Sequence, residues 1–447
     1  MNTDMTTGAP AKVLLRFTMP MLLSAVFQQM YNMTDSVVVG RYVGEAALAA
    51  VGASYPITMI FMAIAQGCNI GCSVIFSQLF GAKENARLKT SISTSMISAL
   101  VLSAVLTGAG FLFCAPLMHL MGTPDNIFAD SKLYLDIYIA GLVFVFLYNL
   151  CTGVFTALGD SRTPLYFLIG SSLSNIVGDI VFVAVFHMGV AGVAWATFIC
   201  QGAAAILSAI ALYRRMKSIE CSEPHALFSW RELRRVSTIA IPSILQQSFI
   251  SVGNLFIQSI VNSFGSSVVA GYSAAIKLNT FALVGFTTLG GGLSSFTAQN
   301  IGAGKHARVK QGFRAGTALT VGIAACFCAG YLIFGAQLVR LFLPSPSAAA
   351  LNEGVMFLRI VSPFFLLISV KLTADGVLRG AGAMKHFMIA TFTDLILRVV
   401  LAFALAPVLG ATGVWLSWPL GWSVAAILST VFYLKGAWKP KEQITCD

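Results

Sequence analysis

Two aspartates inside apolar stretches are the residues of this chain best placed to do chemistry. Asp35 follows the apolar stretch that begins near Pro20, and Asp179 lies in SSLSNIVGDIVF, four residues after Asn175. An aspartate near the centre of a membrane helix costs about 2.5 to 3.5 kcal/mol on insertion scales, so an acid at that depth is a functional candidate by default. The remaining question is which groups surround the two carboxylates.

Asn175 and Asp179 share one face of a helix because they are four residues apart. The next apolar stretch contributes Thr197, and at 1.5 Å rise per residue Asp35, Asp179 and Thr197 all lie about 7 to 12 Å below the same membrane boundary. An all-oxygen set at one level suits a hard cation and fits a shared proton equally well. Alternatively, Asn175 and Thr197 only join helices, at roughly 1 kcal/mol each, and each acid faces a water-filled cavity.

The composition indicates a polytopic membrane protein. Of 447 residues, 57% are hydrophobic and 10% are charged, whereas soluble domains carry about 25% charged residues. The first apolar run lacks a small-residue cleavage site and is too long for a signal-peptide core, so we expect an uncleaved first span. The nine cysteines show neither a disulfide framework nor a zinc spacing.

Hydropathy predicts an all-α integral membrane protein with twelve helices. Lys and Arg concentrate on the termini and on one set of connections, and only Arg41, Lys132 and Arg340 lie on the other set. This asymmetry accounts for the net charge of +11 without a nucleic-acid partner, and it predicts that both termini are cytoplasmic. The expected helices span roughly 13–39, 46–78, 90–114, 133–158, 164–187, 190–213, 236–261, 267–300, 313–335, 354–378, 386–407 and 412–434.

The chain contains an internal repeat. At an offset of 221, Gln78 and Arg87 in FSQLFGAKENARLK correspond to Gln299 and Arg308 in FTAQNIGAGKHARVK. Each half has an even number of helices, so the halves are parallel repeats related by a pseudo-twofold axis along the membrane normal, with the substrate cavity between them. The predicted organisation is an amino-terminal lobe, a cytoplasmic linker and a carboxy-terminal lobe, at 1–213, 214–235 and 236–447.

These features resemble the multidrug and toxic compound extrusion (MATE) transporters, within the superfamily that includes lipid-linked oligosaccharide flippases. The resemblance covers nearly the whole chain: the repeat, the basic central loop, the FGA and IGAG turns, and the LGDSRTP and RGAGAMKH turns. Most specific is the match to the cation site of the DinF-like and archaeal branch, and we place the chain in the DinF-like/MepA-like branch. The matching residues are Pro20, Asp35, Asn175, Asp179 and Thr197.

In those relatives the helix 1 proline marks the point where that helix bends when the site is protonated or takes up sodium. The resemblance implies this role for Pro20. The NorM-like branch instead has an acid on helix 7 and another on helix 10. This chain has Gln246 and Gln247 on helix 7, and Asp375 does not fall at the NorM-like position, so the resemblance does not imply coupling through the carboxy-terminal lobe.

Other charges lie inside the carboxy-terminal lobe. Lys371 with Asp375, and Asp394 with Arg398, are spaced four residues apart, so each pair could neutralise itself locally. Lys277 has no such neighbour, and three roles are open to it: reaching toward the interface, pairing between lobes, or contacting an anionic substrate.

Methionine and aromatic side chains are candidates for lining a substrate cavity. Methionine adapts to ligands of varied shape, and aromatic faces attract organic cations, although such residues also line any helix bundle and face lipid. Together with Lys277, the candidates are Met30, Met33, Phe61, Met62, Phe249 and Phe281.

The function expected from sequence is a cation-coupled antiporter that exports amphiphilic, often cationic, compounds by alternating access. The coupling ion is H⁺ or Na⁺, with a possible Na⁺ site formed by Asp35, Asn175, Asp179 and Thr197, and we expect no other cofactor. We expect a monomer that binds small organic substrates and membrane lipid, in a prokaryotic cytoplasmic membrane.

Two alternatives remain at this stage. A flippase for an anionic lipid-linked or organic-anion substrate is suggested by Lys277, Lys371 and Arg398. An intramembrane enzyme acting on lipid is the other, but the sequence shows no acid-rich metal motif, no nucleophile with an adjacent base and no His–carboxylate cluster. We therefore expect a protein without enzymatic activity.

Overall fold

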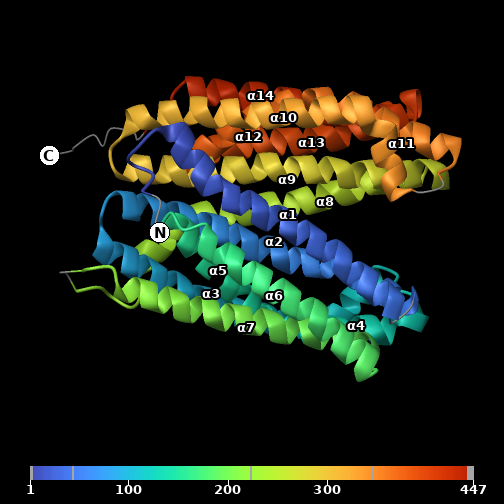
Figure 1. Cartoon of the computed structure of the whole chain (residues 1–447), viewed down its shortest axis with the longest axis horizontal. Coiled ribbons are helices and arrows are strands. Elements are labelled where there is room, and N and C mark those ends of the chain that lie inside the picture. The colour runs from blue at the N-terminus through green and yellow to red at the C-terminus, as the bar shows by residue number, and fades with distance from the viewer. Residues whose placement is uncertain (1–3, 43–44, 222–223, 344–345, 440–447) are drawn as a thin grey trace. The chain divides into compact units, whose positions relative to one another are not determined.

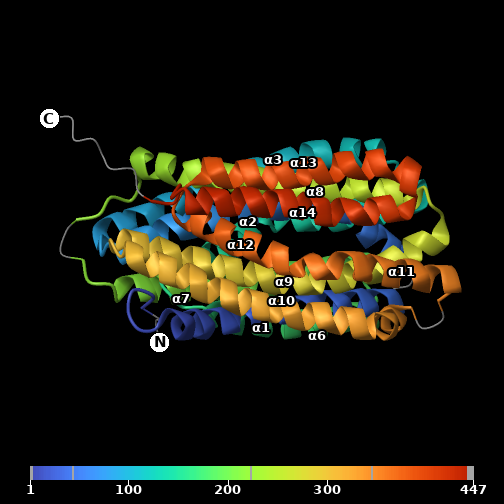
Figure 2. The same ribbon diagram turned by 90° about the horizontal axis from the view of Figure 1, so that it is seen from above.

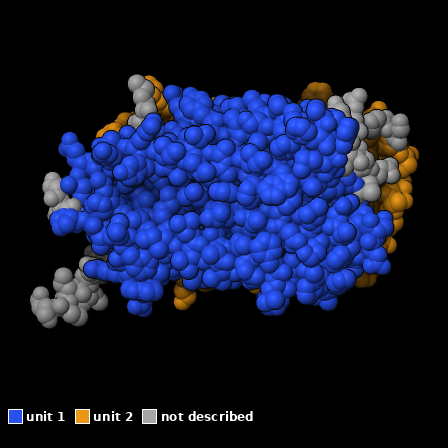
Figure 3. All heavy atoms as spheres, turned by 90° about the horizontal axis from the view of Figure 1, so that it is seen from below, with its two compact units in different colours: residues 1–2, 23–247 blue, residues 3–22, 248–447 orange. Residues whose placement is uncertain are grey.

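The computed structural model describes residues 4–42, 45–221, 224–343 and 346–439, and within them the chain is helical, with no β-strand (Figure 1). These residues form two compact units, which are distinguished by colour in Figure 3. By length and apolar composition, eleven of the described helices could each cross a membrane, and one bent pair of helices could form a twelfth span. The predicted all-α, two-lobed membrane fold is confirmed.

Unit 1 comprises residues 23–247 and contains the end of α1 and the start of α8. Both helices contribute to the two units, because the division falls within each of them. The helices of this unit are α1 (Pro10–Tyr42), α2 (Glu45–Gly81), α3 (Asn85–Leu120), α4 (Asp125–Ala140), α5 (Leu142–Ala157), α6 (Arg162–Ile180), the π-helix η1 (Val181–Val185), α7 (Gly189–Lys217) and α8 (Trp230–Asn262).

Unit 2 begins with residues 4–22, which include the start of α1, and continues from residue 248 to the end of the described chain. Its helices run side by side in both ribbon views (Figure 2). Besides its parts of α1 and α8, the unit contains α9 (Ser266–Gly302), α10 (His306–Phe342), α11 (Ala348–Val361), the 3-10 helix η2 (Ser362–Phe364), α12 (Phe365–Gly380), α13 (Met384–Leu409) and α14 (Ala411–Leu434).

Two predicted spans are interrupted. The span expected at 133–158 is divided at Gly141 into α4 and α5, which are bent by 49°. Gly141 lies so close to α7 that a Cβ there would be 3.1 Å from the Phe198 ring. The span expected at 354–378 contains the 3-10 turn at Pro363, whose missing N–H removes one helical hydrogen bond.

Left-handed backbone positions follow the internal repeat. Lys83 (φ 60°) and Gly304 (φ 71°) lie 221 residues apart in the turns after α2 and α9. Gly159 and Gly382, also with positive φ, lie 223 residues apart in the turns after α5 and α12. Glycine adopts this conformation at little cost, whereas Lys83 does so against a steric penalty. The corresponding turns of the two halves thus share backbone geometry as well as sequence.

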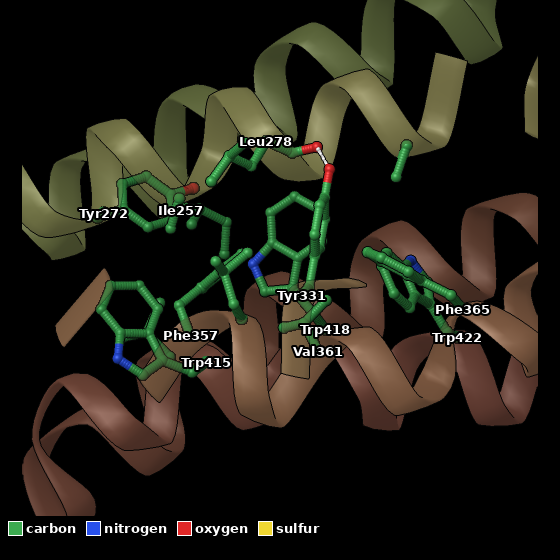
Figure 4. Close-up of a cluster of buried hydrophobic side chains, with 14 of the residues drawn as sticks. Ile257, Tyr272, Leu278, Tyr331, Phe357, Val361, Phe365, Trp415, Trp418 and Trp422 are labelled. Carbon is green, nitrogen blue, oxygen red and sulfur yellow. Dashed lines mark hydrogen bonds between the residues drawn. The ribbon is translucent and has the colours of Figure 1, made fainter. Parts of the chain in front are cut away.

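Aromatic side chains build much of the interior of unit 2 (Figure 4). The Tyr272 and Trp415 rings stack with centroids 5.1 Å apart, and the Tyr331 hydroxyl donates a 2.6 Å hydrogen bond to the Leu278 carbonyl. Buried aromatic residues gain from both apolar burial and ring geometry. This cluster holds α9, α10, α11, α12 and α14 together and borders the charged residues described below.

Candidate cation site and buried charges

Helices α6 and α7 meet closely at the predicted cation site. A Cβ at Gly178 would lie 3.3 Å from the Ala196 Cβ, which allows the two backbones to approach. This approach places Asn175, 2% exposed, beside Thr197, and the Asn175 Nδ2 donates to the Thr197 Oγ1 over 3.4 Å. Asp179 is fully buried one turn after Asn175 on α6.

Helix α1 joins this group through Tyr31, whose hydroxyl donates a hydrogen bond to the Asn175 Oδ1. Tyr31, Asn175 and Thr197 therefore form a chain of hydrogen bonds across three helices of unit 1. Sequence reasoning missed Tyr31, although its place four residues before Asp35 puts the two on one helical face. The side chains of Asp35 and Met33 lie outside the described residues.

A π-helical segment follows Asp179 directly and was also missed. Within η1 the backbone forms wide turns, and the Phe186 N–H donates to the Val181 carbonyl over 3.0 Å. Such segments are rare and are frequent at functional sites. The segment ends where His187 and Gly189 have positive φ. The residues VFVAV do not predict a π-helix, because their apolar pattern fits an ordinary α-helix equally well.

A small cavity has Thr197 in its lining. Its volume of about 10 Å³ is close to the space needed for one water molecule. Tyr134, Tyr138 and Gln201 share its lining with Thr197, and so does Gly141 at the bend between α4 and α5. Asn175 and Thr197 are joined by a hydrogen bond and Asp179 lies one turn further along α6, so these three residues carry oxygen atoms of the kind that a hard cation or a proton can use.

Pro20 lies within α1, in the part of that helix that belongs to unit 2. Proline has no N–H to donate within a helix, so the backbone is easier to bend there. The helix nevertheless runs from Pro10 to Tyr42 without interruption. The bending role of Pro20 stays a prediction.

The cavity candidates of unit 1 have different surroundings. Met30 is 61% exposed, whereas Phe61 is buried in a cluster with Ile57 and Leu135. Met62 is partly buried against the cluster that contains Val145.

In unit 2 the corresponding candidates are exposed. Phe249 and Phe281 are 49% and 42% exposed, and each makes an edge-to-face contact, with Phe392 and Phe327 respectively. The Lys277 ammonium lies 5.9 Å from the centroid of the Phe342 ring. Roles for these residues in binding substrate stay predictions.

The two predicted charge pairs of unit 2 differ in the structure. Lys371 and Asp375 form a buried ion pair, and Ser429 donates a 2.6 Å hydrogen bond to the other carboxylate oxygen. Asp394 and Arg398 form no ion pair. The Arg398 guanidinium instead lies 4.4 Å from the centroid of a Trp418 ring. Spacing alone therefore predicted one pair correctly and the other wrongly, because Trp418 offers Arg398 a different partner.

The two helical units, with a polar site buried among apolar helices, define a multi-pass α-helical membrane protein of the transporter class. The family model MatE matches residues 20–181 and 242–404, more than half of the chain. The chain belongs to the MatE family of membrane transporters, and the resemblance to MATE transporters drawn from its motifs is confirmed.

Individual relatives extend over nearly all of the chain. It is 30% identical over 443 residues to the probable multidrug resistance protein YpnP of Bacillus subtilis, covering 99% of each sequence. It is 28% identical to the probable multidrug resistance protein YoeA of the same organism, over 96% of this chain and 94% of that one. Among solved structures, an outward-facing multidrug resistance MATE transporter of the MOP superfamily matches with a TM-score of 0.90, 23% identity and 98% coverage of both chains.

Proposed function

We propose that this chain is a multidrug antiporter that exchanges an inward-moving H⁺ or Na⁺ for amphiphilic, often cationic, organic compounds. The observation that carries the proposal is the hydrogen-bond chain from Tyr31 through Asn175 to Thr197, with Asp179 fully buried one turn away. The relatives YpnP and YoeA are named as probable multidrug resistance proteins, which supports the substrate class.

In this proposal the cation binds at Asp35, Asn175, Asp179 and Thr197 when the site is open to the outside. Binding changes α1 near Pro20 and disfavours the bound organic substrate. Such opposition is a negative coupling free energy between two sites, so substrate must weaken cation binding by the same factor. Both termini are placed in the cytoplasm, because Lys and Arg concentrate on that side of the sequence.

The proposed protein works as a monomer, has no cofactor besides the coupling ion and resides in the cytoplasmic membrane. The flippase alternative loses one of its supports. Lys371, which would attract an anionic substrate, is held 2.7 Å from the Asp375 carboxylate.

The test is ethidium efflux from proteoliposomes in which a pH gradient and a sodium gradient are imposed separately. We expect efflux from the wild-type chain under one or both gradients, and its loss in Asp35→Asn and Asp179→Asn. Asp136→Asn is the matched control, because Asp136 is paired with Lys132 on α4 and takes no part in the site. Full gradient-driven efflux by Asp179→Asn, incorporated to the same level, would refute the coupling assignment.

A further inference from the structure

The chain turns back on itself where α14 ends. Gly436 has a φ of 75°, its N–H donates to the Tyr433 carbonyl over 3.0 Å, and the Ala437 N–H donates to the Phe432 carbonyl over 3.1 Å. These two bonds form a Schellman motif, which glycine permits because it adopts positive φ at little cost. The turn leaves Trp438 only 3% exposed, with its ring stacked on that of Tyr433.

Three aromatic rings from α10 and the end of α14 form a continuous layer. The Phe313 ring on α10 stacks on the Tyr433 ring with centroids 3.9 Å apart, and the Trp438 ring follows at 6.1 Å from Tyr433, with an interplanar angle of 17°. We call these three residues the ring layer. Tyrosine and tryptophan are enriched at the boundary between membrane and water, so this end of unit 2 has the composition of a membrane interface.

Exposed basic side chains surround the ring layer. Arg314 follows Phe313 on α10, and its charge lies near the Tyr433 hydroxyl. Lys435 is the first residue after α14, and Lys439 folds back over the turn, since a Cβ at residue 436 would lie 3.3 Å from its Cδ. These three cations therefore come together from two segments that are distant in the sequence.

The positive charge at this position is not balanced by nearby acids. Helices α10 and α14 carry no acidic residue, and none of the three cations forms an ion pair within the described part of the chain. Helix α13 adds the exposed Lys385 beside His386, whose ring lies 4.9 Å from that of Phe432. The only acid of α13, Asp394, is nine residues further along. The end of α14 is therefore suited to an anionic partner.

An exposed apolar stripe on α14 leads to these cations. Its residues recur at intervals of four and three, which places them on one face of the helix. A face of this kind on a membrane-spanning helix is suited to acyl chains. The stripe consists of Leu420, Val424, Ile427, Val431 and Leu434, with exposed fractions from 36% to 74%, and Lys435 follows its last residue.

We propose that an anionic phospholipid binds at the end of α14, with its phosphate against Arg314, Lys435 and Lys439 and an acyl chain along the apolar stripe. A phosphodiester suits this group of cations, because arginine offers paired N–H donors and lysine a compact charge. Basic pockets between membrane helices bind anionic headgroups in this way. The inference does not depend on the coupling site proposed above, because that site lies in unit 1.

The general excess of Lys and Arg on one side of a membrane protein is a simpler account of these charges. Residues that only set orientation need no fixed surroundings. Here the Schellman motif, the ring layer and the apolar stripe hold the basic groups beside a track for a lipid chain. A small soluble anion or an acidic protein would make no use of that track. The arrangement therefore favours a lipid.

Native mass spectrometry tests the proposal. The full-length protein in non-ionic detergent is titrated with phosphatidylglycerol and, separately, with phosphatidylcholine of the same chains. We expect the wild type to prefer phosphatidylglycerol, and Arg314→Gln/Lys435→Gln/Lys439→Gln to lose the preference. Each basic group near an anionic headgroup contributes roughly fivefold in affinity, so this variant should bind phosphatidylglycerol about a hundredfold more weakly. Equal affinity of the wild type for the two lipids would overturn the proposal, whether or not the variant folds.

Arg214→Gln/Arg215→Gln/Lys217→Gln is the matched control, because it removes three basic residues from the end of another span, in unit 1. It should leave the affinity for phosphatidylglycerol unchanged, and an equal loss in both triple variants would show diffuse attraction without a site. Trp438→Ala keeps all three cations and should weaken binding several-fold, whereas an unchanged affinity would contradict the role of the ring layer. Inorganic phosphate in excess should not displace the lipid, and displacement would mean that the site takes a soluble anion.

Discussion

Lys371 and Asp375 form an ion pair within α12, with 2.7 Å between the Nζ and Oδ2 atoms and both side chains buried. Removing one partner of a buried pair leaves an uncompensated charge, which typically costs about 3 to 5 kcal/mol. We expect Lys371→Met to lower the thermal unfolding midpoint strongly, as measured on detergent-purified protein.

The double variant Lys371→Met/Asp375→Leu should recover much of this loss, because both charges are then absent. Lys277→Met is the control, since Lys277 is exposed and its ammonium lies 5.9 Å from the centroid of the Phe342 ring. An Lys371→Met protein as stable as Lys277→Met would show that the pair contributes nothing.

Residues 4–8, here called the amino-terminal strap, are fastened to the turn between α9 and α10. Met5 is fully buried, its N–H donates to the Gln299 Oε1, and the Asn300 Nδ2 donates to its carbonyl over 3.0 Å. The Arg308 guanidinium donates to the carbonyls of Met5, Thr7 and Gly8 over 2.7 to 3.1 Å. One arginine thus fixes three peptide units.

Arg308→Ala should release the strap. Hydrogen bonds to a charged group contribute about 1.5 to 3 kcal/mol, and Arg308 makes three of those that hold the strap, whereas Lys305 donates one, to the Thr6 carbonyl over 2.9 Å. We expect faster amide hydrogen exchange at residues 4–8, measured by mass spectrometry on the intact protein. Lys310→Ala, at an exposed position two residues later on α10, should leave this exchange unchanged. Equal exchange in the two variants would contradict the assignment.

Docking of the strap should depend on pH through Asp4. Burial alone raises the pKa of the Asp4 carboxyl, but hydrogen bonds from Thr6 and Thr7 and the charge of Lys305 lower it, and the net shift is downward. A lowered pKa means that ionised Asp4 stabilises the docked strap at neutral pH, and this contribution is lost as the pH falls through the folded-state pKa. Exchange at residues 4–8, corrected for its intrinsic pH dependence, should therefore show extra opening in acid.

Asp4→Asn is the matched variant for this measurement. Its corrected exchange should be faster at neutral pH and should lose the acid-dependent step, because the titrating group has been removed. A wild-type strap whose corrected exchange is flat down to acid pH would rule out a contribution from Asp4.

The repeat explains why these arginines could be recognised from sequence but their partners could not. Arg87 and Arg308 correspond at the offset of 221. Each binds residues at or just before the start of a helix that contributes to both units, α8 and α1 respectively. Arg87 binds the Glu232 carboxylate at the start of α8 over 2.9 Å, whereas Arg308 binds backbone carbonyls before α1. The spacing of identical residues predicted equivalent turns. The contacts differ because residue 11, the counterpart of Glu232, is alanine and offers no carboxylate.

Sequence reasoning was strongest where a single periodic signal decides the outcome. Apolar runs predicted the helices, and Asn175 with Asp179 were placed on one face because four residues make about one turn. It was weakest where tertiary contacts decide. Gly141, at the bend between α4 and α5, lies where a Cβ would meet the Phe198 ring of α7, and the stacking of Arg398 on Trp418 requires two helices to be side by side. Neither relationship is encoded in local spacing.

Gly67 on α2 permits a close helix approach within unit 1. A Cβ added there would lie 2.5 Å from the Ile244 Cα on α8, and backbone cannot move aside as a flexible side chain can. Overpacking of this kind typically costs about 1 to 3 kcal/mol. We expect Gly67→Ala to lower the unfolding midpoint and to reduce the monodisperse fraction in size-exclusion chromatography.

Gly52→Ala is the control on the same helix. A Cβ at residue 52 would meet nothing within 4 Å. At an exposed position inside a helix, alanine stabilises the helix by about 1 kcal/mol relative to glycine. This variant should be as stable as the wild type or slightly more stable. If both substitutions behave alike, the approach of α8 at Gly67 is looser than the structure has it.

Tyr31→Phe tests whether α1 affects binding of the coupling ion through the Tyr31 hydroxyl. The variant keeps the ring and loses only the hydroxyl that donates to the Asn175 Oδ1. A hydrogen bond of this kind contributes about 0.5 to 1.5 kcal/mol, which corresponds to roughly a two- to tenfold weaker half-saturation by the coupling ion. The measurement is initial efflux rate against H⁺ or Na⁺ concentration in proteoliposomes.

Tyr166→Phe provides the comparison, because Tyr166 lies on the same helix as Asn175 but is 65% exposed. It should leave half-saturation unchanged. The decisive measurement is the double variant Tyr31→Phe/Asn175→Ala, because residues that contact each other give non-additive effects. If Asn175 acts through Tyr31, the double variant should bind the ion little more weakly than Asn175→Ala alone. Strictly additive effects would mean that Tyr31 and Asn175 affect ion binding independently. The hydrogen bond from α1 to Asn175 would then not contribute to ion binding.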